Sequence, residues 1–167
     1  MWARKLGLIA TAAELVSELL QLMASSGVDY TIFFRRLSAI PADPAAELSR
    51  PLSALQESFY QPSSEELDAR WSRWLEHWRH EITANGDPSS TAAAMQRVNP
   101  AISWREWLVA PAYERAAQGD TSLIQQLQAV FSHPYEAPSA ELAATYDRLR
   151  PREFFNAGGV SHYSCSS

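Results

Sequence analysis

The sequence predicts an all-α protein, an irregular helical domain of about seven helices followed by a mobile C-terminal tail. Three observations lead to this fold class. Apolar residues recur at steps of three and four in several segments, glycine and proline separate these segments, and no alternating pattern indicates a strand or a hairpin. We expect the helical domain over residues 1–150 and the tail over residues 151–167, where no helical period remains.

The first two helices are predicted from the residues at their ends. Thr11 and Glu14 have the spacing of a capping box, in which each side chain bonds a backbone N–H at the other position. An apolar stripe follows over residues 15–23. Gly27 suits the left-handed position past a helix end, and Asp29 can accept from the first N–H groups of the next helix.

The strongest helix prediction lies in the middle of the chain. A proline-rich break over residues 41–51 and a short helix over residues 52–59 come before it, and Ser63 with Glu66 fits a second capping box. The apolar stripe behind this box consists of Leu67, Trp71, Trp74, Leu75, Trp78 and Ile82. Its flanking charges are mixed, so we interpret the tryptophans as core or interface packing rather than as platforms for nucleic-acid bases.

Residues 95–120 predict where one helix ends and the next begins. Asn99 can cap a helix whose first residue is Pro100, because the missing N–H of proline needs no partner at that position. Trp104 and Trp107 would lie on the apolar face of this helix. Gly119 suits the left-handed position at its end, and Asp120 can cap the following helix. Two further helices are expected over residues 123–131 and 139–149.

The composition excludes several classes of function. The formal net charge of −5 provides no basic field for nucleic acid or for an anionic membrane. No apolar run approaches the roughly 20 residues that span a bilayer. Cys165 is the single cysteine, so the chain has no internal disulfide framework and no cysteine-cluster zinc site. Neither G-x-G-x-x-G nor G-x-x-x-x-G-K occurs, so we expect the chain alone to bind no ATP and no catalytic metal.

Candidate site residues remain few. His77 and His80 lie three apart on one expected helix, but two histidines do not complete a metal site, and we interpret them as part of a solvated face. For Arg105, pairing with a carboxylate and simple exposure stay open as alternatives. Cys165, near the end of the expected tail, is either a redox or nucleophilic thiol or an unreactive lone cysteine.

Several short stretches along the whole chain resemble the C-terminal part of the selenoprotein O family. The matching residues are Lys5-Leu6-Gly7-Leu8, Asp29-Tyr30-Thr31, Phe33-Phe34-Arg35, Met95, Val98-Asn99-Pro100, Arg105, Gly119-Asp120, Pro134-Tyr135 and the terminal Ser164-Cys165-Ser166-Ser167. The resemblance implies a C-terminal helical region of a longer protein adenylyltransferase, which has a kinase-like fold and moves AMP from ATP to protein hydroxyls. Its kinase-like catalytic elements would lie upstream of these residues.

The resemblance also implies cofactors, partners and a role for Cys165. ATP and Mg²⁺ or Mn²⁺ would be bound by the full-length protein, and the partners of this region would be the kinase-like domain and the protein substrates. Some family members carry selenocysteine at the position of Cys165, which favours a redox role there. A cytoplasmic, bacterial-type member is expected. The alternative is a free-standing helical protein-interaction module without catalysis.

Overall fold

The computed structural model describes residues 1–42, 51–83 and 87–155, and it confirms the all-α class. These residues form nine α-helices and three short 3-10 helices, and the part of the chain that is described contains no strand. Val28 and Phe59 make one isolated antiparallel bridge. In the same residues, no helix combines the length and the apolar character that crossing a membrane requires.

The chain divides into two compact units, Met1–Pro100 and Ala101–Ser167. Unit 1 contains α1 (Trp2–Leu6), α2 (Ala13–Ser26), α3 (Tyr30–Leu37), η1 (Ile40–Ala42), α4 (Pro51–Leu55), η2 (Gln56–Ser58), α5 (Glu65–Thr83) and α6 (Pro88–Gln96). Unit 2 contains α7 (Glu106–Ala117), α8 (Ser122–Ser132), α9 (Ala140–Tyr146) and η3 (Arg152–Phe154). The expected division into a domain over residues 1–150 and a tail over 151–167 stays a prediction, since residues 156–167 lie outside the described part.

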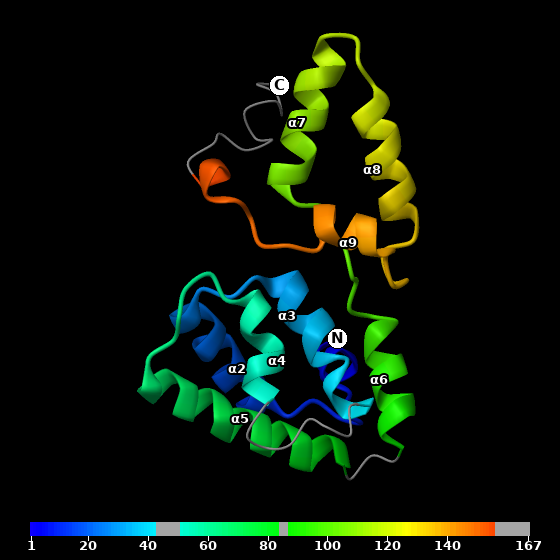
Figure 1. The fold of residues 1–167 in the computed structure, drawn as a ribbon. Coiled ribbons are helices and arrows are strands. Elements are labelled where there is room, and N and C mark those ends of the chain that lie inside the picture. Colours follow the sequence, from blue (N-terminus) through cyan, green and yellow to red (C-terminus); the bar gives the residue numbers. More distant parts are fainter. Residues whose placement is uncertain (43–50, 84–86, 156–167) are drawn as a thin grey trace. The chain divides into compact units, whose positions relative to one another are not determined.

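The tryptophan stripe of α5 forms the centre of the core of unit 1. Trp71, Trp74 and Trp78 are each 0% exposed. Their indole N–H groups donate to Ser26 Oγ at 2.8 Å, to the Leu15 carbonyl at 2.9 Å and to the Leu6 carbonyl at 2.8 Å, respectively. A buried indole N–H is commonly paired in this way, and here the partners belong to α1 and α2. Figure 1 shows α5 running along α2 and α4 in this unit, so of the two expectations for the stripe, core or interface packing, the structure shows core packing.

The helix ends agree with the sequence at some positions and differ at others. Gly27 has φ 61° and closes α2, and the Asp29 carboxylate accepts from the Ile32 N–H at 3.0 Å. The capping box at Thr11 is wrong, because α2 starts one residue later, with Ala12 at its cap and no side-chain bond. At the start of α5, Ser64 accepts from the Leu67 N–H at 3.3 Å, so the cap is Ser64 and not Ser63.

The largest correction concerns the helix expected to begin at Pro100. This helix is α7, which begins at Glu106 with Arg105 at its cap. The Ala101 N–H donates instead to the Pro134 carbonyl at 2.7 Å, so the chain after Pro100 is held in a non-helical path. At the other end of α7, Gly119 has φ 88°, so the expected left-handed position is confirmed. The cap expected at Asp120 is wrong by one position, because α8 has Thr121 at its cap, although the Asp120 carboxylate accepts from the Ser122 N–H at 2.9 Å.

Candidate functional site

The side chain of Asn99 is 0% exposed and lies at the centre of a polar cluster in unit 1. Its amide nitrogen donates to the Lys5 carbonyl and to Ser38 Oγ, both at 2.9 Å. Its amide oxygen accepts from the Lys5 ammonium at 2.8 Å. Both amide protons and the oxygen are therefore satisfied, which a buried amide requires. The expected helix cap is wrong because this side chain bonds residues distant in the sequence.

The Lys5 ammonium lies against two aromatic rings as well as against Asn99. Its nitrogen is 4.6 Å from the ring centre of Phe34 and 5.2 Å from that of Tyr30. Ring faces attract a cation, and the stem of the lysine covers apolar surface. Loss of water around the amine lowers the pKa of Lys5. The single lysine of the chain is thus a structural cation that joins α1 to α3.

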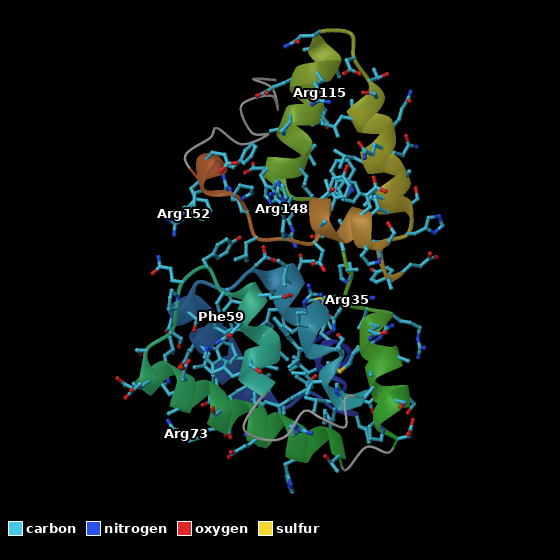
Figure 2. All side chains as sticks on the ribbon, viewed as in Figure 1. Arg35, Phe59, Arg73, Arg115, Arg148 and Arg152 are labelled. Carbon is cyan, nitrogen blue, oxygen red and sulfur yellow. The ribbon has the colours of Figure 1, made fainter. Side chains whose placement is uncertain are left out.

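Arg35 joins α3 to the end of α6. One guanidinium nitrogen donates to the carbonyls of Gln96 and Asn99, both at 3.3 Å (Figure 2). The last carbonyls of a helix have no partner within the helix, so a cation is favourable at this position. Ser38 Oγ, which accepts from Asn99, donates to the Phe34 carbonyl at 2.6 Å. We call Lys5, Phe34, Arg35, Ser38 and Asn99 the Asn99 cluster.

Gly7 brings α1 close to α6 beside this cluster. It has φ 69°, and a Cβ added there would lie 2.8 Å from both Met95 Sδ and Thr91 Cγ2. Both the backbone conformation and the close approach favour glycine. Several stretches that are distant in the sequence therefore meet in one place. They are Lys5-Leu6-Gly7-Leu8, Phe33-Phe34-Arg35, and Met95 with Asn99. The arrangement holds three helices together, and it offers no pairing of a nucleophile with a base.

Arg105 in unit 2 also makes a specific contact. Its guanidinium donates to the Arg148 carbonyl at 2.6 Å, which joins the cap of α7 to the chain after α9. The Arg148 guanidinium in turn lies 5.2 Å from the ring centre of Trp107 (Figure 2). Arg105 is half-buried and its bond to Arg148 is with a backbone carbonyl, so the choice between the two alternatives for Arg105 stays a prediction.

The other candidate residues are not brought together into a site. His77 is on the surface of α5, and its Nε2 lies 3.9 Å from Glu81 Oε1. His80 is also exposed. Within residues 1–42, 51–83 and 87–155, no group of three or more His, Cys, Asp or Glu residues has the arrangement of a metal site. Cys165 lies outside the described residues, so its redox role stays a prediction.

The structure shows one feature that the sequence analysis missed, a groove between α7 and α8 in unit 2. Trp104 is 67% exposed, although it was expected on a helix face, and its ring stacks on Phe131 at 4.8 Å between ring centres. The α7–α8 groove measures about 390 Å³ and is lined chiefly by apolar side chains. No residue of α8 is charged. That absence of charge on a surface helix was the signal available in the sequence.

The chain matches the family model described as protein adenylyltransferase SelO over residues 1–132. Among curated relatives, a protein nucleotidyltransferase YdiU of Methylobacillus flagellatus is 37% identical over 157 residues, which covers 92% of this chain and 29% of the relative. That of Stutzerimonas stutzeri is 37% identical over 156 residues, covering 93% and 28%. That of Rhizobium leguminosarum is 39% identical over 127 residues, covering 74% and 23%.

The chain therefore spans less than a third of the length of these relatives. The matched region contains the whole Asn99 cluster, Arg105 and the α7–α8 groove, whereas Cys165 lies beyond the end of the family match. This chain belongs to the SelO family of protein adenylyltransferases.

Proposed function

We propose that this chain is the C-terminal helical region of a protein adenylyltransferase and that it supports a kinase-like catalytic domain in the same polypeptide. The observation that carries the proposal is the convergence of three matching stretches in the Asn99 cluster. Residues that a family shares for packing alone would be apolar, whereas this cluster uses a buried amide and two cations to join α1, α3 and α6. Such a satisfied polar network specifies one arrangement of helices, which a supporting region needs.

The chemistry of the whole protein would be AMP transfer from ATP to serine, threonine or tyrosine hydroxyls of protein substrates. ATP and Mg²⁺ or Mn²⁺ would be bound by the remaining polypeptide, because the present sequence has no glycine-rich phosphate loop. The residues of this chain would supply position and rigidity only. A cytoplasmic location belongs to the same proposal.

AMP transfer by the longer protein tests this function. The protein made from the native gene, incubated with labelled ATP, Mg²⁺ or Mn²⁺ and a protein acceptor, should transfer AMP, whereas the purified 167-residue chain should not. Transfer by the isolated chain would contradict the supporting role. The absence of transfer by the native protein under all these conditions would contradict the activity.

Cys165 is proposed as a redox switch of the same enzyme. Its thiol and a cysteine elsewhere in the longer protein would form a disulfide, giving up two electrons and two protons to a cellular oxidant such as a disulfide or a peroxide. Activity should then differ between oxidising and reducing conditions, and Cys165→Ser should abolish that difference. An equal redox dependence in both proteins would show that Cys165 is not the switch.

A free-standing interaction module is the second candidate function. The α7–α8 groove favours it, because an exposed tryptophan beside an uncharged helix is typical of the centre of a protein interface. The length of the native gene product distinguishes the two candidates. A product of 167 residues favours the module, and a product with a continuous kinase-like portion favours the enzyme.

A further inference from the structure

Two hollows lie on either side of Arg4 in unit 1. One measures about 220 Å³ and is lined by Met1, Arg4, Lys5, Tyr30 and Val98. The other measures about 400 Å³, and Arg4, Ile9 and Arg97 contribute to its lining. Because Arg4 lines both, the two hollows are neighbours. We define the α1 surface as the surface formed by Arg4, Lys5, Ile9, Tyr30, Arg97 and Val98.

The α1 surface exposes apolar side chains although unit 1 has a well-buried core. Ile9 is 81% exposed and Tyr30 is 45% exposed, whereas Leu6, from the same part of the chain, is 0% exposed. Single exposed apolar residues are common, but their grouping around two hollows is typical of a contact surface. The smaller hollow has room for about one large apolar side chain of a partner.

The charge of the α1 surface is positive in a chain whose formal net charge is −5. Arg4 and Arg97 are exposed, and within the described ranges neither makes an ion pair or a side-chain hydrogen bond. No acidic side chain lines either hollow, and the Lys5 ammonium adds to the positive field. Electrostatic complementarity therefore favours an acidic partner.

Three stretches that resemble the family contribute to this one surface. Lys5, Tyr30 and Val98 come from positions far apart in the sequence, and all three line the smaller hollow. Lys5 and its bond to Asn99 belong to the Asn99 cluster directly beneath. The rigid cluster thus fixes the geometry of the exposed surface above it, as a binding surface requires.

We propose that the α1 surface is the contact with the remaining polypeptide of the longer protein, through an acidic segment that inserts an apolar side chain beside Tyr30. The proposal rests on the proposed function. It names the surface through which this chain would contact the remaining polypeptide and the chemistry of the segment that would bind there. The relatives supply polypeptide for this contact, since this chain spans only 29% of the first and 28% of the second. Because Arg4 and Arg97 are positively charged, we expect the segment that binds there to be acidic.

Hydroxyl-radical footprinting of two samples tests the contact. The purified 167-residue chain is compared with the protein made from the native gene, and each residue is compared with itself by mass spectrometry. Ile9, Tyr30 and Val98 should be modified several-fold more slowly in the native protein. Leu20 on α2, 43% exposed, should be modified equally in both and serves as the control. Equal rates for Tyr30 in the two samples would overturn the proposal.

Charge reversal tests whether the segment that binds the α1 surface is acidic. In the native protein, Arg4→Glu combined with Arg97→Glu should restore the modification rate of Tyr30 to that of the isolated chain. Arg73→Glu, on the exposed side of α5 in the same unit, is the matched control and should leave Tyr30 protected (Figure 2). If Tyr30 stays protected in the Arg4→Glu, Arg97→Glu variant, the proposal of an acidic segment is wrong. It is also wrong if Arg73→Glu removes the protection of Tyr30.

The two proposals fail in different ways. AMP transfer with an unprotected Tyr30 contradicts the contact alone, and protection of Tyr30 without AMP transfer contradicts the proposed function alone. A native gene product of only 167 residues contradicts both.

Discussion

Asn99 and Lys5 bond each other twice, although 94 positions separate them in the sequence. The amide nitrogen of Asn99 donates to the Lys5 carbonyl, and its amide oxygen accepts from the Lys5 ammonium. The pair closes unit 1 by holding its first helix to its last residues. Because Asn99 is fully buried, water cannot replace these bonds when one partner is removed.

Asn99→Ala should therefore destabilise unit 1 by about 3 kcal/mol, since each buried polar group left without a partner costs about 1–3 kcal/mol. This exceeds the roughly 1 kcal/mol of a lost helix cap. Denaturant unfolding of Asn99→Ala, Lys5→Met and the double variant gives the coupling energy, expected at about 0.5–3 kcal/mol. Arg4→Met, next to Lys5 but exposed, is the control. A coupling energy of zero would mean that the ammonium does not stabilise the amide.

Gly7→Ala should cost more than Gly27→Ala. Both glycines have a positive φ, 69° and 61°. An alanine in this left-handed conformation destabilises the fold by about 1–2 kcal/mol at either position. At Gly7 the new Cβ also meets Met95 and Thr91 at 2.8 Å, whereas nothing lies within 4 Å at Gly27. Overpacking of this kind adds about 1–3 kcal/mol. Equal unfolding midpoints for the two variants would show that α6 moves away without cost.

Trp74→Ala should destabilise the protein by about 3–5 kcal/mol, because it removes a fully buried side chain and its bond to the Leu15 carbonyl. Trp104→Ala is the matched control. Trp104 is 67% exposed, and its loss should cost about 0.5–1.5 kcal/mol for the stacking on Phe131. Chemical denaturation of both variants measures the difference. A small loss for Trp74→Ala would contradict its place in the core.

Asp120 should make the stability of unit 2 depend on pH in acid. Hydrogen bonds from Ser122 lower the pKa of Asp120 below its ordinary value of 3.8. A carboxyl with a lowered pKa in the folded state stabilises the fold above its unfolded pKa, and this contribution is lost as the pH falls through the folded value. Asp120→Asn should therefore reduce the loss of stability below pH 3.8, as seen in thermal melts across that range. An unchanged pH profile would contradict the bond to Ser122.

Several of the helices could be predicted from local sequence. The tryptophan stripe of α5, the caps at Asp29 and Gly119 and the end of α2 at Gly27 depend on residues within one or two turns. The resemblance to the family likewise follows from short stretches of sequence, and the comparisons confirm it. These features are determined by neighbours along the chain, so reading the chain in order is enough to find them.

Long-range contacts decided the rest. Asn99-Pro100 has every local sign of a helix start, yet the Asn99 amide bonds Lys5 and Ser38, and the Ala101 N–H bonds Pro134. Trp104, expected inside, lies at the edge of a groove for the same reason, since the segment before α7 is not helical. Sequence alone determined the helical class and the family, because periodicity and short motifs are local. Only the tertiary structure decided the Asn99 cluster, because a buried amide takes the partners that folding brings within hydrogen-bonding distance.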